Sequence, residues 1–393
     1  MASSVDIGTI AGTPATYRAA ARLPGVARAG RRALPLLDWV TSRVSLDSRR
    51  LERLVHAVEP TLSLRDVRAR VVAIRLETHD TKTYVLKPNG RFRGFEPGAY
   101  LSLRIVVDGE PVVRSYSISS SSSTEGLVAI TVKRVDGGIV SNWLFHRLAV
   151  GDVVEIGQAR GSFLLPKDVP PRILMISAGS GITPVMAMLR HVTSLGAQPK
   201  TAFLHFARAP EDIIFRDELA QVAARCPSVG VTICVERAGA DWMGPRGRFT
   251  AALLEEAAPD FREIPIYLCG PAPFMAEVIK ALEATGCDLA NLRYEQFTSG
   301  ADVSAFLATS SLVRFTRSGV ETVVSRPRTL LEVAEARGLR PEHGCRMGVC
   351  GSCRCEKVRG VVIDITTGRE SGDGAESIRP CVSVAKGNVD LDL

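Results

Sequence analysis

The order of apolar and polar positions divides the chain into segments of different character. Between Leu34 and Val58, apolar residues recur at helical spacing between Arg and Asp, which predicts one or two amphipathic helices. From about Val67 to Leu165, short apolar runs alternate with Gly, Pro and Asn, which is typical of an antiparallel barrel or sandwich. The predicted strands are Val71–Leu76, Thr83–Leu86, Tyr100–Val107, Ser115–Ser119, Leu127–Val132 and Val153–Ile156.

The pattern changes after Pro170–Pro171, where apolar strands alternate with amphipathic helices. The predicted strands are Ile173–Ser177, Ala202–Phe206, Val231–Val235 and Ile266–Cys269. The predicted helices are Val185–Leu195, Phe215–Ala224, Ala251–Ala257 and Phe274–Ala284. This alternation requires crossover connections, so it predicts a parallel sheet covered by helices on both faces.

The C-terminal segment follows a linker of small and polar residues at 298–304. It contains the apolar runs Ala305–Phe315 and Glu321–Val324 and a helical stretch, Leu330–Arg337, which together predict a small mixed α and β domain. We therefore divide the chain into segments 1–65, 66–168, 169–297, 298–304 and 305–393.

The composition, 46% hydrophobic and 23% charged, is ordinary for a protein that buries several cores. No run approaches the roughly 20 apolar residues that cross a bilayer, and the N-terminus lacks the features of a secretory signal. We expect a cytoplasmic protein, with peripheral contact at the inner face of the cell membrane as an option.

The net charge of +7 is concentrated at the N-terminus, where residues 1–65 hold ten arginines against five acidic residues. Such an arm suits nucleic acid, an anionic membrane or an acidic partner. The chain has no aromatic and basic platform and no finger motif, so we exclude nucleic acid. The helices of 34–58 are interpreted either as packing on the next domain or as docking on a membrane or partner.

Four of the nine cysteines have the spacing of an iron–sulfur site. Cys345, Cys350 and Cys353 follow a C-x4-C-x2-C pattern, and Cys381 supplies a fourth thiol after a long gap. This is the spacing of a plant-type [2Fe–2S] centre. Glycines at 344, 348 and 351 allow the loop to curl around inorganic sulfide with its N–H groups pointing inward.

Two alternatives to the cluster remain open at this point. Structural zinc would use the same thiols with His343, although zinc sites prefer paired short spacings. Inert thiols are the other alternative. Cys355, just beyond the loop, is interpreted as a bystander.

Two motifs in the first half offer groups suited to a phosphorylated aromatic cofactor, although each alone is weak. Arg114-Ser-Tyr116-Ser117 provides a cation, an aromatic face and a hydroxyl, and alternation places Ser117 on the opposite side of the strand from Arg114 and Tyr116. Gly138 and Ser141 open a short predicted helix, whose N–H groups could hold a diphosphate. Taken alone, each motif is better explained as an ordinary strand or an ordinary helix start.

Two further motifs lie at the ends of predicted parallel strands. Gly179, Gly181 and Thr183 belong to a Gly-rich turn between a strand and a helix, which permits close approach of a phosphate, although it is not the standard dinucleotide fingerprint. Cys269 and Gly270 end another strand, at the edge where such sheets bind ligands. A plain turn and a small buried cysteine are the alternatives.

In this order, the motifs resemble those of the ferredoxin–NADP reductase superfamily fused to a plant-type ferredoxin, over Val67–Leu393. The resemblance implies an antiparallel FAD-binding β-barrel (66–168), a parallel-sheet NAD(P)-binding α/β domain (169–297) and a [2Fe–2S] α+β domain of β-grasp type (305–393). It implies FAD rather than FMN, because a second diphosphate element is present.

The resemblance also implies residue roles. Arg114 would contact the flavin diphosphate, Tyr116 would pack on the isoalloxazine ring, and Ser117 would approach its N5. Gly138 and Ser141 would serve the diphosphate.

In the second half, the resemblance places Gly179, Gly181 and Gly270 around the pyridine nucleotide, with Thr183 near the nicotinamide. Cys269 would lie beside the hydride path and Phe297 near the flavin.

Arg208 and Arg237 end or follow two strands of the parallel sheet and suit the 2′-phosphate of NADPH, whereas Glu236 keeps NADH open. We expect NADPH. Electrons would pass from NADPH through FAD and the cluster, with Ser117, Thr183 and Cys269 as the catalytic set.

The acceptor is the least defined part of this hypothesis. The basic arm before the barrel is similar to that of actinobacterial reductases that serve membrane fatty-acyl-CoA desaturases, which implies desaturase support with residues 1–60 docking at the membrane. A soluble oxygenase, hydroxylase or cytochrome P450 is the alternative acceptor. A [2Fe–2S] redox-sensing module is the alternative from another class.

Overall fold

The computed structural model describes residues 59–63, 65–107, 110–122, 126–196, 198–297, 310–325, 328–343, 348, 351–365 and 368–393. The helices predicted within 34–58, the linker 298–304, Cys345 and Cys350 lie outside these residues. The chain divides into a first unit, Met1–Glu110 with Tyr116–Gln296, and a second unit, Phe297–Leu393 with Pro111–Ser115.

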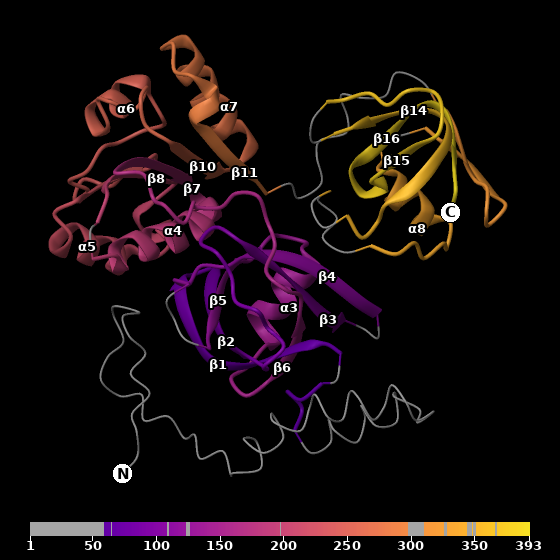
Figure 1. Ribbon diagram of the computed structural model, residues 1–393, viewed down its shortest axis with the longest axis horizontal. Coiled ribbons are helices and arrows are strands. Elements are labelled where there is room, and N and C mark those ends of the chain that lie inside the picture. Colours follow the sequence, from indigo (N-terminus) through magenta and orange to yellow (C-terminus); the bar gives the residue numbers. More distant parts are fainter. Residues whose placement is uncertain are drawn as a thin grey trace. The chain divides into compact units, whose positions relative to one another are not determined.

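The first part of the chain forms a six-stranded sheet in the order β4-β3-β6-β1-β2-β5 (Figure 1). Its elements are β1 (Val67–Thr78), β2 (Thr81–Pro88), β3 (Tyr100–Val107), β4 (Glu110–Ser117), β5 (Val128–Lys133), α3 (Ile139–Arg147) and β6 (Val153–Ile156). The pairs β1–β2, β1–β6, β2–β5 and β3–β6 are antiparallel. Just beyond β4, Ile118 bridges Ile130 of β5, so the two edges of the sheet meet. The prediction of an antiparallel barrel is confirmed.

Local chemistry explains the turn between β1 and β2. The carboxylate of Asp80 accepts hydrogen bonds from the hydroxyls of Thr78 and Thr81, at 2.8 and 2.9 Å. Side-chain acceptors of this kind stabilise tight turns because they satisfy groups that the strands leave unpaired.

The next segment forms a five-stranded parallel sheet in the order β11-β10-β7-β8-β9. Its strands are β7 (Arg172–Ala178), β8 (Lys200–Ala207), β9 (Val229–Val235), β10 (Ile266–Gly270) and β11 (Leu292–Gln296). Its helices are α4 (Ile182–Ser194), α5 (Arg216–Arg225), α6 (Ala251–Ala257) and α7 (Ala272–Ala284), with short 3-10 turns η1 (Gly179–Gly181), η2 (Pro210–Asp212) and η3 (Leu289–Asn291). The predicted strands and helices are all present, and β11 is an addition that the mostly polar sequence Leu-Arg-Tyr-Glu-Gln did not indicate.

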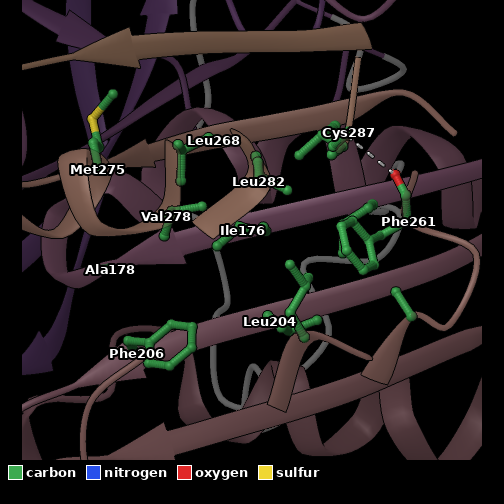
Figure 2. Close-up of a cluster of buried hydrophobic side chains, with 14 of the residues drawn as sticks. Ile176, Ala178, Leu204, Phe206, Phe261, Leu268, Met275, Val278, Leu282 and Cys287 are labelled. Carbon is green, nitrogen blue, oxygen red and sulfur yellow. Dashed lines mark hydrogen bonds between the residues drawn. The ribbon is translucent and has the colours of Figure 1, made fainter. Parts of the chain in front are cut away.

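One face of this sheet packs against α6 and α7 (Figure 2). Val278 and Leu282 of α7 lie over Ile176, Leu204 and Leu268, and all five side chains are buried. Alternate residues of the same strands point the other way, toward α4, whose Met186 and Leu189 are fully buried. Helices therefore cover both faces, as the alternating pattern predicted.

The second unit contains a mixed sheet in the order β13-β12-β16-β14-β15. The pair β12–β16 is parallel, and the pairs β12–β13, β14–β15 and β14–β16 are antiparallel. Its elements are β12 (Ser311–Phe315), β13 (Val320–Val324), α8 (Leu330–Ala336), β14 (Cys355–Asp364), β15 (Glu376–Ile378), η5 (Pro380–Val382) and β16 (Ser383–Leu391). A capping box of Thr329 and Glu332 begins α8, which packs Leu330 and Val333 on the sheet. This is the small α+β domain that the sequence predicts.

Candidate functional site

The Arg114–Ser117 motif ends β4, and its last residue contacts the parallel-sheet domain. Ser117 is buried, whereas Arg114 and Tyr116 are partly exposed. The Ser117 hydroxyl donates a hydrogen bond of 3.4 Å to the Glu295 carboxylate on β11, 178 residues away. The barrel motif and the edge of the parallel sheet therefore meet inside the first unit.

Glu295 is the residue that sequence reasoning missed. Its backbone lies in register beside Cys269 of β10. Burial raises the pKa of Glu295 to about 7, while the hydrogen bond from Ser117 acts in the opposite direction. The carboxyl therefore changes its charge near neutral pH. The available signal was the Tyr294-Glu295-Gln-Phe297 segment, which the sequence analysis used only for Phe297.

Cys269 is fully buried next to this carboxyl. Burial, and then the negative charge of Glu295, raise the pKa of the Cys269 thiol well above its usual value. The sulfur is therefore a neutral thiol at physiological pH. A buried, neutral thiol suits a residue that packs against an apolar ring rather than a residue that acts as a nucleophile.

The Gly-rich turn lies directly against the end of β10. A Cβ added to Gly181 would lie 2.3 Å from the Cys269 carbonyl oxygen and 2.6 Å from the Gly270 nitrogen, so no side chain fits there. Thr183 is buried in the first turn of α4, and its hydroxyl donates to the Ser180 carbonyl at 3.0 Å. Glycine at 181 therefore lets the predicted nucleotide loop approach Cys269 and Gly270, which lie more than eighty residues further along the chain.

The start of α3 has the features of an anion site. Gly138 is the N-cap and, as a glycine, offers no side-chain cap to the first N–H groups of the helix. Ser141 accepts a hydrogen bond from the Val135 N–H at 3.1 Å, which folds the preceding turn. A Cβ on Gly138 would lie 2.7 Å from the Ser141 hydroxyl.

Arg208 and Arg237 lie side by side at the carboxyl ends of β8 and β9. The Arg237 N–H donates to the Arg208 carbonyl at 2.7 Å, and both side chains are exposed. Glu236, which could hold a ribose hydroxyl, is paired with Arg248 at 2.8 Å. The site is therefore basic at the position where a 2′-phosphate would lie.

In the second unit, two of the four predicted cluster cysteines lie together. The Cys353 and Cys381 sulfurs are 3.2 Å apart, and both residues are buried. The Gly348 N–H donates to the Cys381 sulfur at 3.3 Å. Gly348 has a φ of +73°, and a Cβ there would lie 2.7 Å from Val382. Two buried thiols in contact, one of which receives a backbone N–H, suit a cluster. Cys345 and Cys350 lie outside the described residues.

Comparisons with known proteins agree with this geometry. An oxidoreductase FAD-binding domain matches residues 68–164, an oxidoreductase NAD-binding domain residues 175–280, and a 2Fe-2S iron-sulfur cluster binding domain residues 313–386. An NADPH oxidoreductase of Mycobacterium tuberculosis is 33% identical over 86% of this chain and 87% of its own. A glycine betaine monooxygenase reductase subunit of Pseudomonas aeruginosa is 36% identical over 82% and 94%.

Among solved structures, phthalate dioxygenase reductase superposes with a TM-score of 0.59 at 26% identity, covering 83% of this chain and 97% of its own. The chain belongs to the family of FAD- and NAD-binding reductases fused to a 2Fe–2S ferredoxin domain. The reductase is a flavin and iron–sulfur NAD(P)H oxidoreductase, and its cofactors are FAD and a [2Fe–2S] cluster.

The residues of the reductase fit these groups. The start of α3 suits the FAD diphosphate, and the Cys353–Cys381 pair lies within the segment that matches the 2Fe-2S iron-sulfur cluster binding domain. Cys355 packs instead with the core beneath α8, separate from the cluster of buried residues that contains Cys353 and Cys381.

The structure brings some predicted residues together and leaves others apart. Ser117, Gly181, Cys269 and Gly270 converge around Glu295. Phe297 belongs to the second unit, so its expected place near the flavin stays a prediction.

No helix within the described residues is long and apolar enough to cross a membrane. The basic arm and its predicted docking role lie outside them.

Proposed function

We propose that the reductase takes a hydride from NADPH and supplies single electrons, through FAD and the [2Fe–2S] cluster, to an oxygenase component. The contact between Ser117 and Glu295 carries this proposal, because it joins the flavin motif to the strand beside Cys269. The names of the relatives support an oxygenase as the acceptor. They include reductase subunits of glycine betaine monooxygenase and stachydrine N-demethylase, and the ferredoxin reductase component of 3-ketosteroid-9-alpha-monooxygenase.

Each part of the site has a proposed role. FAD supplies the chemistry that converts a two-electron hydride into single electrons. Ser117 would approach the flavin N5, and Arg114 and Tyr116 would hold the flavin diphosphate and ring. Gly138 and Ser141 would hold the diphosphate from the start of α3.

On the nucleotide side, the Gly179–Gly181 turn and Gly270 accommodate NADPH, with Thr183 and Cys269 bordering the nicotinamide. Glu295 would control the charge beside the ring, because its pKa lies near 7. Cys345, Cys350, Cys353 and Cys381 would hold the cluster. Phe297 would lie near the flavin.

The choice of NADPH rests on Arg208 and Arg237. Two exposed arginines whose backbones are hydrogen-bonded suit a dianionic 2′-phosphate, and the acid that NADH would need is paired with Arg248. The name of the mycobacterial relative, NADPH oxidoreductase, supports the same choice.

A fatty-acyl-CoA desaturase is the second acceptor to test, because the ten arginines of residues 1–65 suit an anionic membrane. The oxygenase is the leading proposal, because the relatives whose names state an acceptor system belong to monooxygenases and a demethylase.

An anaerobic titration of the full-length holoprotein with NADPH tests the first half of the proposal. We expect bleaching of the flavin absorbance followed by a one-electron [2Fe–2S] EPR signal. Flavin bleaching without an EPR signal would contradict electron transfer to the cluster, and a faster response to NADH would contradict the coenzyme choice.

Acceptor assays test the second half. The reduced protein is mixed with a purified soluble oxygenase component or with a desaturase in anionic vesicles, each with and without residues 1–60. Turnover with the oxygenase that is independent of the arm supports the leading proposal. Turnover with the desaturase alone, lost on removal of the arm, would overturn it.

A further inference from the structure

Seven residues of the first unit form a closed cycle of hydrogen bonds and ion pairs, which we call the polar ring. Its members are Arg75, Glu77, Thr83, Ser119, Thr131, Arg190 and Glu218. Five come from the barrel part of the chain, and two come from α4 and α5 of the nucleotide-binding part. Two arginines face two glutamates, so the ring balances its own charge.

The barrel half of the ring is a chain of short contacts. The Ser119 and Thr131 hydroxyls are 2.8 Å apart, as are those of Thr131 and Thr83. The Thr83 hydroxyl donates to Glu77 at 2.5 Å, and Glu77 also accepts from the Arg75 guanidinium at 2.6 Å. Ser119, Thr131 and Thr83 are buried, so the contacts among these three hydroxyls are made away from water.

Arg190 closes the ring from the nucleotide-binding half. Its guanidinium forms a two-pronged pair with Glu218, at 2.7 and 2.5 Å, and donates a further bond to the Ser119 carbonyl. Glu218 lies 3.8 Å from Arg75, which completes the cycle. The Arg190 guanidinium also lies 4.6 Å from the centre of the Phe215 ring. Each nitrogen of this fork therefore has a partner, which a lysine could not reproduce.

The ring joins the two segments that carry the candidate hydride site. Ser119 is two residues beyond Ser117, and Arg190 is seven residues beyond Thr183 on the same helix, α4. Seven residues of α-helix span about 10 Å and behave as a rigid rod. Whatever fixes Arg190 against Ser119 therefore also fixes Thr183 relative to Ser117.

We propose that Arg190 is a positioning residue for hydride transfer. It holds the flavin strand and the nucleotide loop at the separation and angle that the reaction requires. This inference rests on the proposed roles of Ser117 and Thr183. Misplacement of reacting groups by about 1 Å can cost on the order of a hundredfold in rate, so a contact outside the reacting atoms is sufficient to control the reaction.

The burial of the Arg190–Glu218 ion pair allows an effect on positioning to be distinguished from an effect on stability. The Arg190 and Glu218 side chains are 10% and 6% exposed. Replacement of a buried ion pair by apolar groups is often neutral for stability, whereas removal of one partner leaves a buried charge unpaired. Arg190→Met alone would change both the positioning and the stability, so we compare it with the double variant Arg190→Met/Glu218→Leu.

The test is stopped-flow reduction of the flavin by NADPH in full-length holoprotein. For both variants we expect a limiting rate of flavin bleaching at least about tenfold below wild type, with NADPH dissociation constants within about twofold. The primary deuterium isotope effect with C4-deuterated NADPH should stay at its maximum. Reduction of the cluster by dithionite should be unchanged.

Arg172→Met is the matched control. Arg172 forms a 2.6 Å ion pair with Asp260, and both belong to the nucleotide-binding part, so its loss does not touch the barrel. We expect a wild-type bleaching rate. Equal rates for Arg172→Met and the Arg190 variants would overturn the proposal.

Arg190→Lys serves if the larger changes fail to fold. Lysine keeps the positive charge and loses the planar, forked guanidinium, so the flavin of this variant should also bleach more slowly than in wild type. A wild-type rate would show that geometry at Arg190 is unimportant and would overturn the inference. Failure of the wild type itself to bleach with either nucleotide would contradict the proposed function instead.

Discussion

The candidate hydride site and the candidate cluster site are built in opposite ways. Three of the four predicted cluster thiols, Cys345, Cys350 and Cys353, lie within nine residues of one another in the sequence. The hydride site joins Ser117 on β4, Gly181 before α4, Cys269 on β10 and Glu295 on β11. The cluster site takes three of its four predicted ligands from one short stretch of sequence, with Cys381 as the distant fourth. The hydride site depends on the register of a sheet and on contacts between the barrel and the nucleotide-binding part.

This difference determines how each site responds to mutation. In a local site, each ligand acts directly on the bound group, so one substitution removes function. In an assembled site, function also depends on contacts such as the polar ring, which never touch a reacting atom. We expect the effects of mutations to be abrupt in the first case and graded in the second.

The largest effect is expected for Cys381→Ser. Loss of one thiolate should abolish the [2Fe–2S] EPR signal and nearly all electron transfer to a protein acceptor. Reduction of ferricyanide, which accepts electrons directly from the flavin, should persist, because Cys381 belongs to the second unit. Iron content, EPR and the two activities are measured together.

Cys226→Ser is the control for Cys381→Ser. Cys226 is a partly exposed free cysteine at the end of α5, outside the predicted ligand set. It should retain the full EPR signal. An intact cluster in Cys381→Ser would show that the distant thiol is not a ligand and would break the contrast between the two sites.

The next effect concerns the protonation of Glu295. Burial raises its pKa to about 7, so the carboxyl is neutral below that pH and negative above it. A negative charge beside the flavin opposes the electron density that a hydride brings. The rate of flavin reduction should therefore fall as pH rises through 7, by about tenfold for each further unit if the neutral form alone reacts.

Glu295→Gln isolates that charge. The amide resembles the neutral carboxyl at every pH, so its rate should be similar to wild type at pH 6 and exceed it at pH 8.5. Stopped-flow profiles of both proteins provide the measurement. Parallel profiles would contradict the role assigned to Glu295.

Glu295 also shows where prediction from sequence ends. The barrel, the parallel sheet and the small mixed domain follow from periodicity, because each run of apolar residues reports its own burial. β11 is an edge strand of mostly polar residues, so periodicity does not indicate it. The pairing of Glu295 with Cys269 depends on sheet register, and the contact with Ser117 on how two parts of the first unit meet. Neither is encoded in a local pattern.

Arg208 and Arg237 provide a graded test of the assembled site. Each charge-assisted hydrogen bond to a 2′-phosphate is worth about 1.5–3 kcal/mol, so Arg208→Ala or Arg237→Ala should lower kcat/KM for NADPH by roughly 10- to 100-fold. NADH turnover should change little, because it lacks that phosphate. Equal losses with both coenzymes would contradict the 2′-phosphate assignment.

Gly181→Ala tests the close approach of the nucleotide loop to β10. The added Cβ would lie 2.3 Å from the Cys269 carbonyl, so the turn must shift, at a cost of about 1–3 kcal/mol. We expect a lower unfolding midpoint and weaker NADPH binding. Gly196→Ala, where no atom lies within 4 Å of the added Cβ, is the control and should leave both unchanged.

The smallest effect is expected for Cys355→Ala, and it tests the local site. By sequence Cys355 is as close to Cys353 as any ligand, so proximity alone would include it in the cluster. In the structure it begins β14 and packs with the core beneath α8, whereas Cys353 and Cys381 pack with Leu331 and Val382. Iron content and acceptor reduction should stay within about twofold of wild type, the range of a change of about 0.5 kcal/mol. Loss of iron in this variant would show that Cys355 exchanges with one of the four predicted ligands, and that even a local site depends on strand placement as well as spacing.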